Sequence, residues 1–283
     1  MSKNTEVVAE PSDIKKIKVA AIIEYHGAHF HGWQRQKHHP EPTIQAALED
    51  ALSKVANEPI SVICAGRTDA GVHASTQVIH FETTAQRRPY NWLRGTNTKL
   101  PIGISVRWVN EVDNDFHARF SAVSRRYRYL IYNKPVQQGL MYDQLTWCRF
   151  PLDAEKMHCA AQSLLGKNDF TSFRAKDCQA NTPYREIKDI SVKRYGDIIM
   201  IEVQANAFLY HMIRNIAGVL IPIGMDRKPI EWCADLLEIK DRSKAGVTAP
   251  SDGLYFVGVE YPEKFNIPSQ SWGPVFVEPW LCK

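Results

Sequence analysis

One short loop between two apolar runs most constrains how this chain folds. The loop runs Cys64-Ala65-Gly66-Arg67-Thr68-Asp69-Ala70-Gly71-Val72-His73-Ala74, and runs rich in β-branched residues precede and follow it, at 60–63 and 76–81. Such runs favour strands, so we expect a strand, a loop and a second strand. Gly66 and Gly71 permit a left-handed backbone or a close approach to a ligand. A cation, a hydroxyl and a carboxylate between them indicate a functional site.

Composition excludes several classes of protein. The chain has 283 residues, of which 44% are hydrophobic and 23% charged, so a sizeable core in one large or two modest domains is expected. No apolar stretch approaches the roughly 18 residues needed to span a bilayer, and the N-terminus lacks the pattern of a secretory signal. The six cysteines are scattered without a CxxC pair, which predicts neither disulfides nor a zinc knuckle and favours a cytoplasmic location.

Positive charge is concentrated in one part of the chain. Residues 87–134 carry ten lysines and arginines against three acidic residues, with tyrosines and tryptophans interleaved. Cations for phosphates and aromatic rings for unstacked bases suit a surface for structured RNA. Ordinary solvated strand faces explain such a stretch as well, and for the basic stretch alone we favour that interpretation.

The order of expected elements predicts the fold class. Amphipathic helices are expected at 43–56 and after Asp153, and an apolar helix at 207–223. Strands are expected at 17–25, 102–109, 127–133, 184–194, 198–206 and 254–260. Without regular βαβ alternation, this order predicts an α+β fold of two similarly built domains, each a mainly antiparallel sheet with helices on one face. We expect a flexible N-terminal tail at 1–16, domains at 17–113 and 114–262, a linker within 109–121, and an extended C-terminal tail at 263–283.

Five histidines lie between His26 and His39, which raises the question of a metal site. No carboxylate or cysteine joins them at a regular ligand spacing, and the spacing of histidines in a loop is weak evidence alone. We therefore predict no metal and expect hydrogen bonds to RNA or to nearby backbone.

Four stretches in order resemble one enzyme family, the A-type tRNA pseudouridine synthases. They are Gly66–Ala74, Phe30–Gln36, Ser124–Tyr129 and Phe208–Asn215, and the resemblance covers about residues 17–261. It implies two sheets joined across a central RNA-binding cleft. It also implies isomerisation of uridine to pseudouridine in the anticodon stem–loop of tRNA, at positions 38, 39 and 40, by a homodimer and without a cofactor.

The resemblance assigns the catalytic carboxylate to Asp69, which acts as a nucleophile or as a base; the sequence does not choose between them. Arg67 is two residues away, so in an extended loop both face the RNA; Arg67 either helps to displace the target base or contacts a phosphate. Arg214 lies in an apolar segment and needs an anionic partner. The resemblance supplies Asp69 as that partner, whereas a structural salt bridge to another carboxylate is the alternative.

Two further residues match the family's base-binding positions. Tyr127 corresponds to the tyrosine that stacks on the target uracil, and Leu254 to an apolar wall against the base. The surroundings of Leu254 depart from the family pattern, because Ser251-Asp252 adds a charge and Phe256 is bulkier than the expected aliphatic residue.

Two other functions are less consistent with these residues. A catalytically silent tRNA-binding protein would not need Asp69. A nuclease would need a metal-binding carboxylate cluster or a paired acid and base, and the sequence shows neither.

Overall fold

A single ten-stranded sheet runs through the whole molecule. The structure is a computed structural model that describes residues 16–36, 41–268 and 273–281. The strands are β1 (Ile17–Tyr25), β2 (Ile63–Cys64), β3 (His73–Thr83), β4 (Ile104–Val112), β5 (Ser124–Asn133), β6 (Thr146–Cys148), β7 (Gly166–Asp169), β8 (Tyr184–Tyr195), β9 (Ile198–Ala205) and β10 (Leu254–Glu260). Their order is β4-β1-β3-β10-β5-β9-β8-β7, with β2 beside β3 and β6 beside β5.

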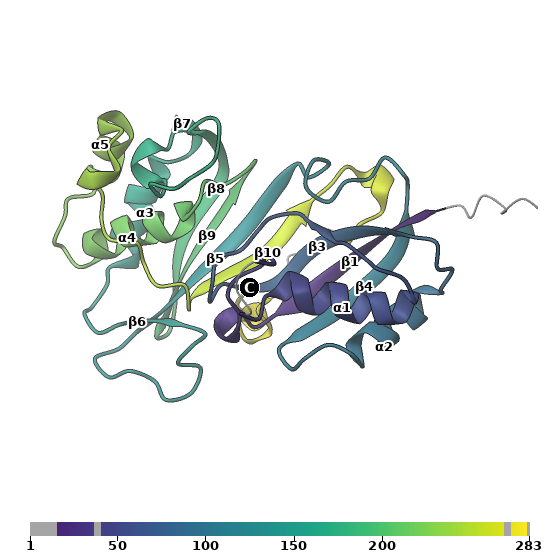
Figure 1. Cartoon of the computed structure of the whole chain (residues 1–283). Coiled ribbons are helices and arrows are strands. Elements are labelled where there is room, and N and C mark those ends of the chain that lie inside the picture. The colour runs from purple at the N-terminus through teal and green to yellow at the C-terminus, as the bar shows by residue number, and fades with distance from the viewer. Residues whose placement is uncertain (1–15, 37–40, 269–272, 282–283) are drawn as a thin grey trace, which may run out of the picture.

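The last strand, β10, joins the two halves of the sheet. It pairs antiparallel with β5 and parallel with β3, where Tyr255 and Phe256 lie opposite His73 and Ala74. Figure 1 shows β10 in yellow between β3, in blue, and β5, in teal. The predicted α+β class with two joined sheets is confirmed, and the joint places the start of β3 beside the start of β10.

Helices cover one face of the sheet in both halves. They are α1 (Ile44–Ala56), α2 (Pro89–Asn97), α3 (Ala154–Gln162), α4 (Met212–Gly224) and α5 (Trp232–Ile239). The Oγ1 atom of Thr43 accepts the Ala46 amide and begins α1, and the carboxylate of Asp153 caps α3. Leu48 of α1, Met157 of α3 and Ile216 of α4 all belong to one continuous core.

The opposite face of the sheet has a smaller core of its own, which the C-terminal segment helps to cover. Val277, in the turn before the short helix α6 (Glu278–Leu281), is fully buried among residues of β5, β9 and β10. The ring of Trp280 stacks on Tyr195 at 5.4 Å. Arg128 points to this face, pairs with Glu202 and donates to the Gly273 carbonyl.

Three expectations from the sequence need correction. The apolar helix begins at Met212 and not at residue 207, because His211 has a left-handed backbone (φ 61°). The expected linker within 109–121 is partly strand, because β4 continues to Val112. The described part of the C-terminal tail packs as short helices. The predicted N-terminal tail lies almost wholly outside the described residues, and the domain boundaries remain a prediction.

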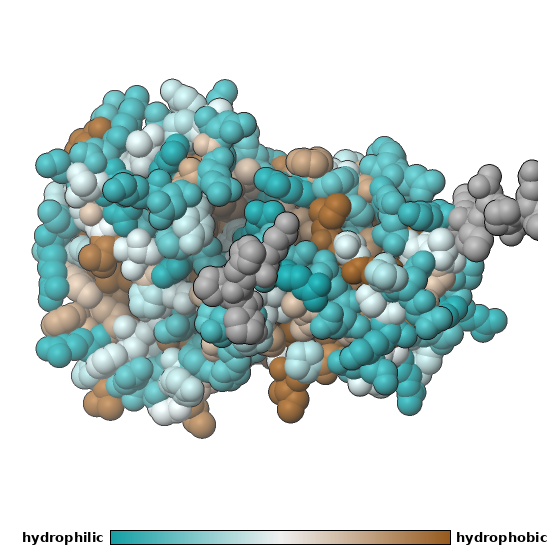
Figure 2. Space-filling model, in the orientation of Figure 1, coloured by the Kyte–Doolittle hydropathy of each residue, from teal (hydrophilic) through white to brown (hydrophobic). Residues whose placement is uncertain are grey.

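The surface of the molecule is mostly hydrophilic, as expected when the apolar residues are buried in a core. In Figure 2 hydrophilic residues dominate the visible face, and hydrophobic ones are scattered among them. No helix within the described ranges combines the length and the apolar character that crossing a bilayer requires.

Candidate active site

The loop between β2 and β3 is held from both sides. The Trp33 amide donates to the Thr68 carbonyl (3.0 Å), and the Tyr25 hydroxyl lies 2.8 Å from Thr68 Oγ1. On the other side, the Gln77 amide nitrogen donates to the Gly66 carbonyl at 2.6 Å. These hydrogen bonds fix the backbone immediately before Asp69, which a site on a loop requires.

The two framing glycines have different roles. Gly71 adopts a left-handed backbone (φ 80°), and a β-carbon there would meet the Ser251 side chain at 2.4 Å. Gly66 keeps negative φ, and a β-carbon would lie 3.7 Å from the Tyr127 hydroxyl. The sequence suggested a left-handed backbone at either glycine, and only Gly71 adopts one.

The loop lines a cavity of about 610 Å³ where the two halves of the sheet meet. This volume falls within the roughly 300–1,000 Å³ of small-molecule sites. Four of the five site residues expected from the sequence line this cavity: Arg67, Asp69, Tyr127 and Leu254. Arg214 is not among the lining residues, but its guanidinium reaches Asp69. The cavity therefore draws on the loop, β5, the start of α4 and the start of β10.

Asp69 lies between two basic side chains. Its Oδ2 atom is 3.5 Å from Nη1 of Arg214 and 3.3 Å from Nε2 of His211. All three side chains are about one-fifth exposed, so water and a ligand can reach the carboxylate. The Asp69–Arg214 pair is the one that the family resemblance implies. His211 is an additional partner that the sequence did not reveal.

The start of α4 aims both basic groups. His211 precedes the helix with its left-handed backbone, and its ring stacks on Tyr210 at 3.9 Å. One turn later, Arg214 Nε donates to the Ala249 carbonyl (2.8 Å), and the Ala249 amide donates back to the Arg214 carbonyl (3.1 Å). With Nε occupied, the terminal nitrogens of the guanidinium point toward Asp69.

Burial changes the proton affinity of this pair. It raises the pKa of Asp69, and the charges of His211 and Arg214 oppose the rise. Burial lowers the pKa of His211, and Asp69 opposes that change. A carboxylate with a raised pKa is more basic than an ordinary aspartate, which suits it to act as a base or a nucleophile.

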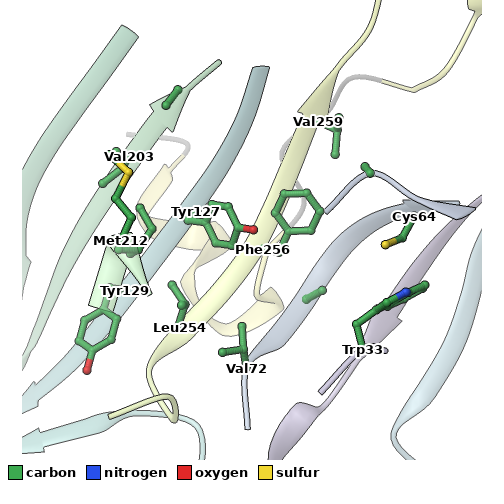
Figure 3. Packing of buried hydrophobic residues seen from close by; sticks show 14 of the residues in the cluster. Trp33, Cys64, Val72, Tyr127, Tyr129, Val203, Met212, Leu254, Phe256 and Val259 are labelled. Carbon is green, nitrogen blue, oxygen red and sulfur yellow. The ribbon is translucent and has the colours of Figure 1, made fainter. Parts of the chain in front are cut away.

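Aromatic and aliphatic side chains form the wall beside the carboxylate. The Tyr127 ring packs against Phe256 (4.8 Å) and edge-on to Phe208 (4.9 Å), and Figure 3 shows Leu254 and Val72 alongside. Phe256, the bulkier residue that departs from the family pattern, is fully buried behind Tyr127. Burial also raises the pKa of Tyr127, so its phenol remains protonated at neutral pH.

Four arginines add positive charge to the cavity. Arg67 is exposed and lines it together with Arg119, Arg125 and Arg185. Arg125 donates to the carbonyls of Ala65 (3.2 Å) and Arg119 (2.5 Å), which joins β5 to the loop. Other cations of the basic stretch form separate pairs; Arg107 pairs with Glu24, for example. The basic stretch 87–134 therefore does not form one continuous positive surface, and only some of its cations lie at the cavity.

A second group of polar side chains lies away from this cavity. His26 and His29 follow β1, and Asp143 approaches them from the loop before β6; their ligand atoms all lie within 4.8 Å of one another. The expectation of no metal rested on the lack of a nearby carboxylate in the sequence. The fold supplies one from a distant segment.

Comparison with known proteins places this geometry in context. A family model described as tRNA pseudouridine synthase matches residues 21–121 and 160–262. Proteins named tRNA pseudouridine synthase A are similar over 92% of this chain: one from Pseudoalteromonas atlantica is 57% identical and covered over 98% of its length. Those from Yersinia pestis and Escherichia fergusonii are 54% and 53% identical, covered over 98% and 96%.

Proposed function

The chain belongs to the tRNA pseudouridine synthase family, and from this premise we propose that it isomerises uridine to pseudouridine in tRNA. The observation that carries the proposal is the partly exposed Asp69 carboxylate, paired with Arg214 at a cavity of about 610 Å³. A catalytically silent tRNA-binding protein would not need this carboxylate.

The reaction balances without an external reagent. The C1′–N1 bond breaks, the uracil turns over, a C1′–C5 bond forms, and the proton on C5 is released while N1 gains one. No oxidation state changes and no group enters or leaves, so the proposal needs no cofactor. What the protein must supply is a carboxylate near the ribose, a wall for the freed base and a way to extract the nucleotide from its stack.

Asp69 is the proposed catalytic residue, as a nucleophile toward the sugar or ring or as a base toward the ribose. Its raised pKa favours either role. Arg214 opposes protonation of the carboxylate and orients it through the 3.5 Å pair. His211 approaches the same oxygen, which makes it a positioning residue for Asp69.

The remaining wall residues suit a displaced pyrimidine. Tyr127 offers a ring for stacking, and Leu254 an apolar surface at the start of β10. Arg67 is exposed at the cavity and can take the place of the target base in the stack or contact a phosphate.

The substrate assignment follows the family. We propose uridines at positions 38, 39 and 40 of the anticodon stem–loop, a homodimer with one tRNA across both subunits, and a cytoplasmic location. Arg119 and Arg125 at the cavity supply charge for the RNA backbone. A mass measurement in solution tests the dimer.

The activity can be tested with tRNA labelled with tritium at uridine C5. Isomerisation releases the label to water and leaves the strand intact, whereas a nuclease would shorten the strand. A matched tRNA with cytidine at positions 38 to 40 should release no label. If the uridine-containing tRNA releases no tritium, the proposed activity is contradicted. If a tRNA that is unlabelled at positions 38 to 40 releases as much tritium as the fully labelled tRNA, the assigned positions are contradicted.

A further inference from the structure

The group formed by His26, His29 and Asp143 has the donor atoms of a metal site. Both histidines lie at the turn after β1, on either end of the short helix Gly27–His29, and Asp143 belongs to the loop between β5 and β6. Two imidazoles and one carboxylate that converge in this way form a donor set that zinc accepts, with a fourth position for water.

The spacing of two of these donors fits a shared cation better than a hydrogen bond. Nε2 of His26 lies 3.6 Å from Oδ2 of Asp143. A tetrahedral zinc with bonds of about 2.0–2.1 Å places its ligand atoms about 3.3 Å apart, whereas a hydrogen bond needs about 2.7–3.2 Å. Nε2 of His26 is itself shielded from solvent and has no hydrogen-bond partner among the described residues. A buried polar atom in this state calls for an explanation.

The surrounding backbone holds His26 and Asp143 in place. The His26 amide donates to the Gly103 carbonyl (2.8 Å). His73, between the two segments, accepts the Gly27 amide at Nδ1 (3.0 Å), and its Nε2 lies 3.0 Å from the Asp143 carbonyl. With Nδ1 as acceptor, Nε2 carries the proton and donates. One buried imidazole therefore connects the backbones of both ligand-bearing segments.

His29 is the adjustable member of the group. Its side chain is exposed, so its ring can rotate to close the distance of up to 4.8 Å. The backbone at Gly27, between the histidines, packs closely on Val72: a β-carbon added there would lie 2.0 Å from the Val72 carbonyl. This backbone therefore has no room to shift as the His29 ring can. The fixed backbone and one free ring allow a cation to complete the site without rearranging the fold.

We propose that His26, His29 and Asp143 bind one divalent transition-metal cation, with zinc as the best match. None of the three residues lines the Asp69 cavity, so the cation has a structural role outside the reaction. It connects the end of β1 to the loop before β6, and thereby joins the two halves of the chain behind the Asp69 loop. The competing explanation is a His26–Asp143 ion pair without a metal.

Zinc binding to the full-length protein tests the proposal directly. Chelator-treated protein is titrated with zinc sulfate in a calorimeter, and thermal unfolding is followed with and without zinc. We expect one zinc per chain and a higher unfolding temperature. His29→Ala and Asp143→Asn should each weaken binding at least about tenfold. Because His29 is exposed, its replacement is compatible with folding.

A matched control lies two residues away. His31 is exposed and pairs with Glu41 at 3.5 Å outside the group, so His31→Ala should bind zinc as the wild type does. Cobalt(II) should give the visible absorption bands of four-coordinate cobalt in wild type and in His31→Ala, and lose them in His29→Ala. No stoichiometric zinc in the wild type, or equal loss in His31→Ala and His29→Ala, overturns the proposal. These readouts do not depend on tRNA, so their failure is distinct from failure of the proposed activity.

Discussion

At Asp69, burial and neighbouring cations act in opposite directions on one carboxyl group. Burial raises its pKa, and Arg214 and His211 oppose the rise. The pKa of His211 is itself lowered by burial, so its charge is lost at a lower pH than that of an ordinary histidine. Arginine, unlike histidine, does not titrate near neutral pH, and Arg214 is the arginine that pairs with Asp69. It therefore has the more constant influence on the ionisation of Asp69.

Replacing Arg214 should change the pH dependence of the reaction. Arg214→Gln removes a charge that favours the carboxylate, so the pKa of Asp69 should rise further. The acidic limb of the kcat/KM profile, which follows ionisation of the free enzyme, should move to higher pH by about 1–3 units. His211→Gln, measured in parallel, should move it less, because burial lowers the pKa of His211 and so disfavours its charged form. A limb that stays in place or moves to lower pH in Arg214→Gln contradicts this account.

The sequence predicts only part of the site around Asp69. An anionic partner for Arg214 was expected, because a cation in an apolar segment needs an anion; that this partner is Asp69 was implied by the family resemblance. His211 was not found, because the apolar pattern around it suggested a continuous helix. Its left-handed backbone interrupts that helix and turns the ring toward Asp69. Histidine is one of the few residues other than glycine that are enriched in this conformation, but nothing in the residue order marks His211 in particular for it.

Among the elements, the segment 246–249 crosses close to α4 and holds the Arg214 side chain in its orientation. Gly218 makes the crossing possible, because a β-carbon there would lie 1.8 Å from the Val247 carbonyl. The same segment supplies the Ala249 carbonyl that accepts from Arg214. Packing at Gly218 and orientation of the guanidinium are thus parts of one contact.

Gly218→Ala separates helix propensity from packing. Propensity alone predicts a gain of about 1 kcal/mol from alanine in a helix. The clash with backbone predicts a net loss of about 1–3 kcal/mol, together with lower activity as Arg214 shifts. Urea unfolding measures the change in stability, and tritium release measures the change in activity. Gly95→Ala in α2 is the control, because its new β-carbon meets only the movable Val55 side chain at 3.2 Å. Stabilisation by Gly218→Ala contradicts the packing argument.

The sequence predicts the bounds of some helices well, but it does not predict where each strand lies in the sheet. The helix α1 was predicted within a residue, because its apolar stripe and the Thr43 cap are local signals. The position of β10 between β3 and β5 was not predicted, because pairing across so many residues leaves no local pattern. Asp143 reaches His26 for the same reason: the fold joins segments that the sequence keeps far apart.

For the whole molecule, the sheet needs cover on both faces. The helices bury one face, and the described C-terminal segment 273–281 contributes to the other. Val277 is fully buried there, while Val275 in the same turn is 73% exposed. This segment lacks a periodic pattern, which is why its packing could not be predicted from sequence.

Val277→Ala should therefore destabilise the protein. Removing two buried methyl groups costs about 2 kcal/mol when the site cannot collapse, and chemical unfolding at equilibrium measures it. Val275→Ala makes the same chemical change at an exposed position and should stay within about 0.5 kcal/mol of wild type. Equal effects of the two substitutions would show that the segment does not pack on the sheet.

The Asp69 carboxylate is proposed to carry out the isomerisation. The most direct test is the single-turnover rate of tritium release by Asp69→Asn, with tRNA affinity measured on the same preparation. Asparagine keeps the size of the side chain and removes its charge. We predict a rate at least about a thousandfold lower with nearly unchanged affinity, while Asp235→Asn, at an exposed position on α5, behaves as wild type. Release at the wild-type rate by Asp69→Asn would contradict the account.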